Sequence, residues 1–257
     1  MAFAWRAWTV SALVVLSGCA TVDRPGSQVP ANTRFNKVAV VSVAGDTFYR
    51  AYTGLTVFNN ELEVRDIGEW GLDRQFAESA RLTLTKLGMT VAEPAEAPAA
   101  FKAVNGTKVT GWGGEWAAVE QASKDYCSAR SVDALLLIGR ARVGDFLMQG
   151  SNQTFGGVGV YGRGPVGPAG RLHVIAQMGM INCQTGKPVA TKLVTVFPAQ
   201  RLSDQVMGLP MLTISPALAE QPMASWSADQ WQFFRKSLGT LANGAFDTSI
   251  RHMFTQP

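Results

Sequence analysis

KVAVVSV (residues 37–43) and ALLLIG (residues 134–139) are two unbroken apolar runs. Runs of this kind are typical of strands buried on both faces in the centre of a parallel sheet. Between them, residues 72–87 and 116–130 carry apolar side chains at three- or four-residue spacing, which predicts two helices. A short strand is expected at residues 89–92. The order strand, helix, strand, helix, strand predicts parallel pairing with right-handed crossovers, and therefore an α/β fold.

The flanking segments predict further elements on this sheet. Residues 45–69 are rich in aromatic and β-branched residues and are interpreted as a hairpin. Residues 172–181 and 189–197 are interpreted as a second, antiparallel hairpin, with Thr185-Gly186 in its turn. A weaker strand is expected at residues 103–110, and residues 198–224, with four prolines, are expected to be irregular.

A helix is expected at the C-terminus. Ser227 and Gln230 form a capping box, and an apolar stripe continues toward Phe254, with Asn243-Gly244 as a possible interruption. The predicted fold class is α/β: a single mixed-sheet domain with helices on the sheet, an antiparallel hairpin and a C-terminal helix.

Residues 144–170 contain nine glycines in 27 positions and are expected to form a Gly-rich loop. Within them, residues 157–162 match the string G-x-G-x-x-G. A dinucleotide-binding loop of this kind needs a helix to begin inside the motif, so that its N-terminal amides face the pyrophosphate. Gly164-Pro165 follows instead, which favours a flexible loop without a nucleotide cofactor.

Composition narrows the class of protein. The chain has 257 residues, of which 47% are hydrophobic and 16% charged, so a disordered chain is excluded. A single apolar run approaches membrane length, at the extreme N-terminus, which excludes a polytopic membrane protein. The net charge of +4 is spread along the chain without a basic cluster, so nucleic acid is not an expected partner.

The first nineteen residues have the layout of an export signal. Arg6 precedes an apolar stretch that ends in Leu16-Ser17-Gly18-Cys19. This ending resembles the lipobox of bacterial lipoproteins; the alternative is an ordinary secretory signal. The resemblance implies that residues 1–18 are a cleaved signal peptide and that Cys19 carries the lipid. It also implies, from Ala20 in place of an aspartate, an anchor in the outer membrane on its periplasmic face.

The mature chain is expected to divide into a tether and a domain. Residues 19–34 carry two prolines and mostly small or polar side chains, which predicts a lipidated N-terminus and a flexible tether. Residues 35–257 are then the periplasmic α/β domain.

Two cysteines and two histidines remain as candidates for chemistry. Cys127 and Cys183 form a disulfide in an oxidising compartment if the helix end and the strand end that carry them converge; otherwise they are two buried thiols. His173 and His252 stand alone in the sequence, so no metal site and no cofactor is expected.

Three segments together resemble a group of envelope lipoprotein domains. They are KVAVVSV, CSARSVDALLLIGRARV and INCQTGKPVA. The pattern is similar to curli-secretion lipoproteins, penicillin-binding-protein activator lipoproteins and the N-terminal domain of the Tol translocation protein. The glycine common in that family before the Asp133 segment is replaced around Arg130-Ser131. The resemblance implies a non-enzymatic accessory or assembly factor that binds another envelope protein or copies of itself.

Two alternatives remain beside that interpretation. Ala44-Gly45-Asp46-Thr47 resembles the Gly-Asp-Ser opening of SGNH-type esterases, with Thr47 as nucleophile and Asp247 and His252 as its activating pair. The threonine and the five-residue spacing of the pair both depart from that pattern, which needs a serine and a spacing of three. The other alternative is a self-assembling secretion-type ring or pore built from the Gly-rich segment.

Aromatic residues near glycines are the candidate partner surface. Trp112 and Trp116 lie beside three glycines, and Phe155 and Tyr161 lie in the Gly-rich segment. Core packing is the competing interpretation for the tryptophans.

Overall fold

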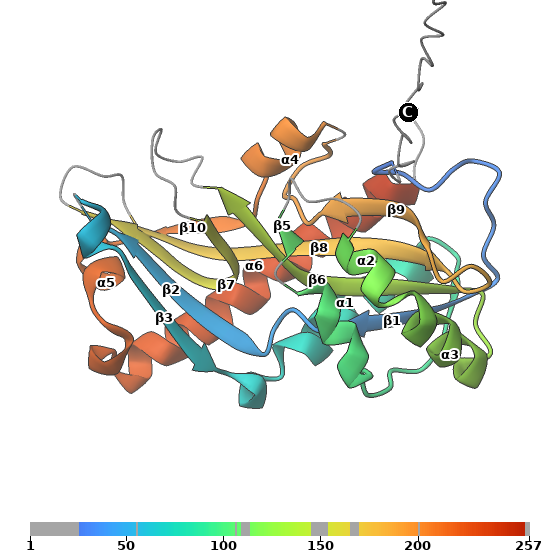
Figure 1. Cartoon of the computed structure of the whole chain (residues 1–257), viewed down its shortest axis with the longest axis horizontal. Coiled ribbons are helices and arrows are strands. Elements are labelled where there is room, and N and C mark those ends of the chain that lie inside the picture. Colours follow the sequence, from blue (N-terminus) through green and yellow to red (C-terminus); the bar gives the residue numbers. More distant parts are fainter. Residues whose placement is uncertain are drawn as a thin grey trace, which may run out of the picture.

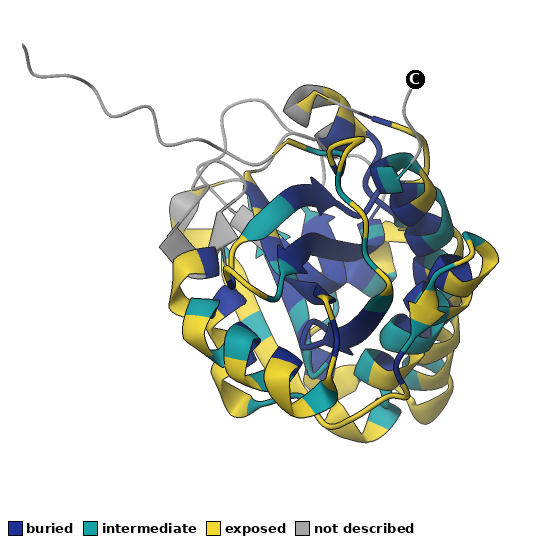
Figure 2. Cartoon of the chain, turned by 90° about the vertical axis from the view of Figure 1, so that its right-hand side faces the viewer, coloured by how far each residue is buried: buried dark blue, intermediate teal, exposed yellow. Residues whose placement is uncertain are grey.

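Three parallel strands occupy one half of the sheet, as the two apolar runs predicted. In the computed structural model, which describes residues 26–54, 56–105, 107–108, 114–144, 154–164, 170–199 and 201–254, β1 pairs in parallel with β6 on one side and β4 on the other. Val38 lies opposite Ala134 and Ser42 opposite Ile138. Helices cover both faces of these strands, which is why their side chains carry no polar alternation (Figures 1 and 2).

The remaining strands are mostly antiparallel. β8 pairs with β6, β7, β9 and β10, and β7 pairs in parallel with β2. β2 in turn pairs antiparallel with β3, which ends the sheet on that side. The strands are β1 (Lys37–Ser42), β2 (Thr47–Thr53), β3 (Glu61–Asp66), β4 (Thr90–Val91), β5 (Thr107–Lys108), β6 (Ala134–Gly144), β7 (Thr154–Arg163), β8 (Gly170–Asn182), β9 (Pro188–Leu193) and β10 (Met211–Ile214).

The helices form two layers. α1 and the long α6 pack together on one face, and η3, α2 and α3 cover the other (Figure 1). Phe76, Ala80 and Leu84 of α1 share its buried face at four-residue spacing, and Gly88, at φ 84°, follows its end. The helical elements are η1 (Val57–Asn59), η2 (Gly68–Trp70), α1 (Leu72–Lys86), η3 (Ala99–Val104), α2 (Gly114–Ala118), α3 (Glu120–Arg130), α4 (Leu202–Met207), α5 (Pro216–Glu220), η4 (Met223–Ser225) and α6 (Ala228–Phe254).

This arrangement confirms the predicted fold class. A mixed sheet carries helices on its faces, β8 and β9 form the expected hairpin, and a helix ends the described chain. Residues 47–66 form the expected first hairpin. The capping box is present, because Gln230 N donates to Ser227 Oγ at 3.3 Å and Ser227 N donates to Gln230 Oε1 at 2.7 Å. None of the helices in the described ranges combines the length and the apolar character needed to cross a bilayer.

The Gly-rich stretch is the largest correction. Residues 154–163 are not loop but β7, which lies inside the sheet between β2 and β8. The glycines serve close contact: a Cβ atom built on Gly159 would lie 2.0 Å from the Tyr49 carbonyl oxygen of β2. Val158 and Val160 supply the apolar face of the same strand. Glycine content therefore marks tight packing here.

Smaller predictions were wrong in detail. Residues 198–224 hold α4, β10, α5 and η4. Residues 103–104 are the end of η3, and residues 107–108 form the short β5. The helix expected at 116–130 is divided at Val119 into α2 and α3. α6 continues through Asn243-Gly244. A glycine inside a helix costs roughly 1 kcal/mol, and burial of Phe246, Ile250 and Met253 beyond it offsets that cost.

The tether also begins later than its composition suggested, since residues 26–34 lie on the domain. Gly26 bridges to Ala190 of β9, and Val29 is buried with its N–H bonded to the Met253 carbonyl of α6 at 2.8 Å. The prediction of a flexible tether is therefore wrong for these residues.

Candidate protein-binding edge

The predicted aromatic surface is wrong at two of its four residues. Trp116 is 3% exposed, and its ring packs where a Cβ on Gly179 would stand. Tyr161 is 2% exposed and belongs to the core between β7 and β8. Trp112 and the side chain of Phe155 lie outside the described residues. Both buried rings face the interior because alternate residues of a strand, or one stripe of a helix, must cover the core.

Cys127 and Cys183 form a disulfide in the structure. Cys127 lies near the end of α3, and Cys183 follows β8. Pairing of β6 with β8 brings these ends together: Ala134 lies opposite Asn182, and Cys183 N donates to the Asp133 carbonyl at 3.0 Å. Of the two alternatives for these thiols, the structure has the bridge.

The proposed esterase residues are not brought together. Gly45 N bonds to Asp73 Oδ1 at 2.8 Å, so the Asp46-Thr47 turn sits at the start of α1. Asp247 instead accepts a hydrogen bond from Thr83, ten residues further along α1, a rise of about 15 Å. A catalytic histidine must lie within hydrogen-bond reach of both the nucleophile and the aspartate, and one imidazole cannot span this separation, so Thr47 and Asp247 cannot share His252 as the base.

The local partners of these residues fit structural roles. Thr47 Oγ1 donates to Asp46 Oδ1 at 2.8 Å, and Lys102 Nζ pairs with Asp46 Oδ2 at 2.7 Å. Burial raises the pKa of Asp46, but the hydrogen bonds from Lys102 and Thr47 outweigh it, so the pKa lies below its ordinary value. Asp247 is bound by Arg251 at 2.9 Å, one helical turn away. Burial, followed by the charge of Lys192, lowers the pKa of His252.

Within the described ranges, no three His, Cys, Asp or Glu side chains are grouped as a metal site would need. His173 lies in β8 with Nδ1 3.2 Å from the Gly157 carbonyl oxygen. Complete burial lowers its pKa from 6.5 to about 4, because the imidazolium loses hydration; the carbonyl oxygen of Gly157 partly opposes this.

His173 should make the protein sensitive to acid. Between pH 6.5 and about 4 the unfolded chain binds a proton at this residue and the folded chain does not. The free energy of unfolding should therefore fall as the pH falls through this window, by about 3 kcal/mol from this residue. Urea unfolding at pH 7 and pH 4 measures the loss, and His173→Gln should remove most of it while the half-buried control His252→Gln should not. An equal acid loss in His173→Gln would contradict the assignment.

Among the large apolar side chains on the described strands, the two most exposed belong to β3, in the β2–β3 hairpin. Phe58, in η1 at its tip, is 94% exposed, and Leu62 and Val64 of β3 are 64% and 58% exposed. Leu62 and Val64 lie opposite Ala51 and Tyr49 of β2, so they share one face of the hairpin. Isolated exposed apolar residues are common, but three on one hairpin mark a candidate protein contact.

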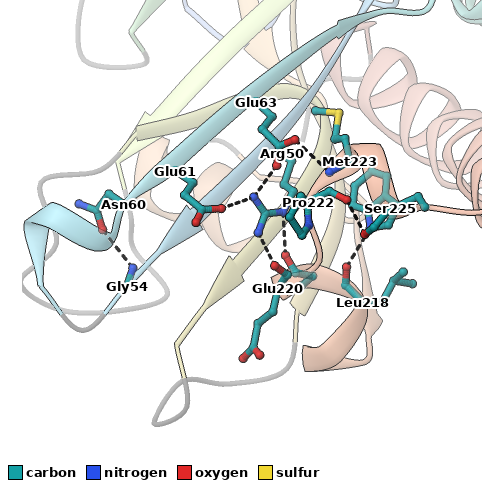
Figure 3. Close-up of polar contacts among 12 residues, drawn as sticks. Arg50, Gly54, Asn60, Glu61, Glu63, Leu218, Glu220, Pro222, Met223 and Ser225 are labelled. Atoms are coloured by element: carbon teal, nitrogen blue, oxygen red, sulfur yellow. Dashed lines mark hydrogen bonds and ion pairs between the residues drawn. The ribbon is translucent and has the colours of Figure 1, made fainter.

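A buried arginine holds this hairpin against the rest of the domain. Arg50 of β2 is fully buried, and its Nη1 atom donates to Glu61 and Glu63 of β3 at 2.6 Å each (Figure 3). Nε and Nη2 donate to the carbonyl oxygens of Ala219 and Glu220 in α5, at 3.1 and 2.5 Å. Glu63 Oε2 also accepts from Met223 N at 2.9 Å. One guanidinium thus joins two strands and a helix, with its charge balanced by carboxylates.

Two glycines allow α5 to approach the sheet closely enough for these bonds. A Cβ atom on Gly162 of β7 or Gly170 of β8 would lie 2.9 or 2.4 Å from the Ala219 Cβ atom. Either contact would displace α5 and the two carbonyl oxygens that Arg50 binds. The Gly-rich composition of this region therefore contributes directly to the position of the hairpin.

Aromatic packing holds the same hairpin on its helix-covered face. Phe48 of β2 contacts the rings of Trp226, Trp231 and Phe234, with centroids 5.4 to 5.8 Å away. Arg65 of β3 lies over Trp231, 4.3 Å from its ring centroid. The edge strand is thus anchored on the helix-covered face, and its other face is left to Leu62 and Val64.

Sequence reasoning identified the hairpin but not this edge. The alternation Glu61-Leu62-Glu63-Val64-Arg65 is a signal for a strand with two unlike faces. Such alternation normally buries its apolar residues, whereas here the charged face turns toward α5 and α6. Arg50, which causes that reversal, has no distinguishing mark in the sequence.

No protein-family model and no curated protein sequence matches this chain.

Proposed function

We propose that this chain is a lipid-anchored protein of the bacterial envelope that acts as a non-enzymatic accessory or assembly factor. In this proposal Cys19 carries the lipid, the anchor lies on the periplasmic face of the outer membrane, and the domain binds its partner, another envelope protein or a second copy of itself, through β3. The exposed apolar face of the rigidly held β2–β3 hairpin is the observation that carries the binding function. A pre-positioned edge strand loses little conformational entropy on binding, which favours recognition.

The disulfide supports the proposed location. Disulfides persist in oxidising compartments such as the periplasm and are rare in the cytosol. The Cys127–Cys183 bridge therefore agrees with the export signal that residues 1–19 resemble. The two features are independent, since one lies in the leader and the other in the folded domain.

The binding function is tested by photo-crosslinking in intact cells. A photo-reactive amino acid at position 62 should yield a discrete crosslinked product, because Leu62 lies on the exposed face of β3. The same amino acid at position 82, on the exposed side of α1, is the matched control and should yield none. Absence of a product at position 62, or equal products at both positions, would overturn the proposal.

The anchor makes a separate prediction. Cys19→Ser should abolish acylation and release the protein from the membrane fraction, because the thiol is the group that takes up the lipid. Mass spectrometry of the N-terminal peptide and membrane fractionation measure both effects. Ala20→Asp is the control: it should keep the lipid and move the protein to the inner membrane. Normal outer-membrane fractionation of Cys19→Ser would contradict the lipobox interpretation.

A further inference from the structure

The outer edge of β3 is open to a further strand. In the described part of the chain, β3 is hydrogen-bonded to β2 on one side and to no strand on the other. An edge of this kind is a template for pairing, and proteins block it with proline, bulges, covering segments or charged side chains, which a partner strand must match with opposite charges. β3 has no proline, and its charges, on Glu61, Glu63, Arg65 and Asp66, are of both signs.

The order of these charges is self-complementary. Two copies of β3 paired antiparallel about a two-fold axis place like-facing residues opposite one another. With the axis at Glu63, Glu61 lies opposite Arg65 of the second copy, and Leu62 lies opposite Val64 of the second copy; each pair occurs twice. Opposite charges then face each other on one side of the sheet, and apolar side chains meet on the other.

Neighbouring registers lack this match. An axis at Leu62 sets Glu61 against Glu63 of the second copy. An axis at Val64 sets Glu63 against Arg65 but also sets Leu62 against Asp66. Like charges or an apolar–charged pair directly opposite are unfavourable in a sheet. The edge therefore selects one register out of the three.

The two Glu63 residues meet at the axis, and their like charges are partly compensated within each chain. Each carboxylate is already bound within its own chain, Oε1 by Arg50 at 2.6 Å and Oε2 by the Met223 N–H at 2.9 Å. Arg50 shares its positive charge between Glu61 and Glu63, so the repulsion between the two Glu63 residues across the axis is reduced but not removed.

In this register Leu62 and Val64, the two apolar side chains exposed on β3, are covered by the second copy.

We propose that the partner of the β3 edge is a second copy of this chain, which joins the two sheets into one through an antiparallel β3–β3 pair centred on Glu63. This inference rests on the proposed function and specifies its partner. The assembly is a closed dimer, because a two-fold pairing of edges uses both and leaves neither free.

Two differently tagged full-length copies, expressed together and extracted from membranes in mild detergent, test the dimer. The tagged copies should co-isolate, and Val64→Lys in both should weaken co-isolation about tenfold, since each lysine would stand opposite Leu62 of the other copy. Leu82→Lys, a matched change on exposed α1, should leave it unchanged. Thermal unfolding of both variants separates lost pairing from lost folding.

Cysteine crosslinking tests the register. One copy carrying Leu62→Cys and another carrying Val64→Cys should form an intermolecular disulfide more readily than two copies carrying Val64→Cys, because only the mixed pair is directly opposite. Equal co-isolation in Val64→Lys, or preferential crosslinking of Val64→Cys with itself, would overturn the register.

Photo-crosslinking at position 62 distinguishes this inference from the proposed function. A product of twice the chain's mass that contains only this protein supports both. A product with a different envelope protein, and none with itself, overturns the dimer and leaves the proposed function standing. No product at all overturns both.

Discussion

Arg50→Met should lower the free energy of unfolding by about 3 kcal/mol, because it removes a buried guanidinium that binds two carbonyl oxygens and two partly exposed carboxylates. The substitution leaves Glu63 without its cation and the Ala219 and Glu220 carbonyl oxygens without a donor. Arg50→Lys should recover only part of the loss, because one ammonium does not reproduce the four bonds of the planar guanidinium. Urea unfolding at pH 7 of the purified unsubstituted protein, Arg50→Met and Arg50→Lys measures these differences in stability.

Two controls isolate the buried charge as the cause. Arg74→Met, on the exposed side of α1, removes the same side chain and should change stability by less than about 0.5 kcal/mol. Adding Glu61→Gln and Glu63→Gln to Arg50→Met should restore part of the loss, since the uncompensated carboxylate is then removed. A loss below about 1 kcal/mol in Arg50→Met would show that α5 and the aromatic cluster hold the hairpin without it.

Replacing both cysteines, Cys127→Ala with Cys183→Ala, should lower the free energy of unfolding by about 4 kcal/mol. The bridge closes a sequence separation of 56 residues, and constraining the unfolded chain over such a loop stabilises the folded state by that amount in the chain-entropy description. Urea unfolding under oxidising conditions measures the difference from the unsubstituted protein.

The reductant provides the control. Dithiothreitol should destabilise the unsubstituted protein to near the level of the double variant and should leave the double variant unchanged. Equal stability of oxidised protein and double variant would mean that pairing of β6 with β8 alone fixes this corner of the fold. The result bears on location as well, because a domain that depends on this bridge is suited to an oxidising compartment.

The segments predicted correctly from sequence are those whose local residue pattern matches their environment in the folded domain. β1 and the first half of β6 are apolar on both faces, and that pattern is compatible only with a central position in the sheet. Likewise, α1 has a complete apolar stripe and a terminating glycine, and the β8–β9 hairpin has its Thr-Gly turn. Each of these signals lies within a short window of the chain.

Two of the wrong predictions, the Gly-rich loop and the aromatic surface, have the same physical cause. A glycine-rich strand resembles a loop in sequence, because glycine occurs both in flexible loops and in strands that another backbone approaches closely. β7 is a strand of the second kind, and its neighbours β2 and β8 are distant in sequence. Trp116 and Tyr161 were misassigned for the same reason, since the surfaces that bury them come from other segments.

Residues close together in the chain encode the α/β class, the central strands, the main helices and the resemblance to an exported lipoprotein, so these could be predicted from sequence. The disulfide, the separation of the esterase residues and the outward-facing apolar edge of β3 became visible in the folded structure. Those features depend on contacts between distant segments, above all on Arg50 reaching α5 some 170 residues away. Burying that guanidinium turns the charged face of the hairpin inward, so its apolar face is left exposed.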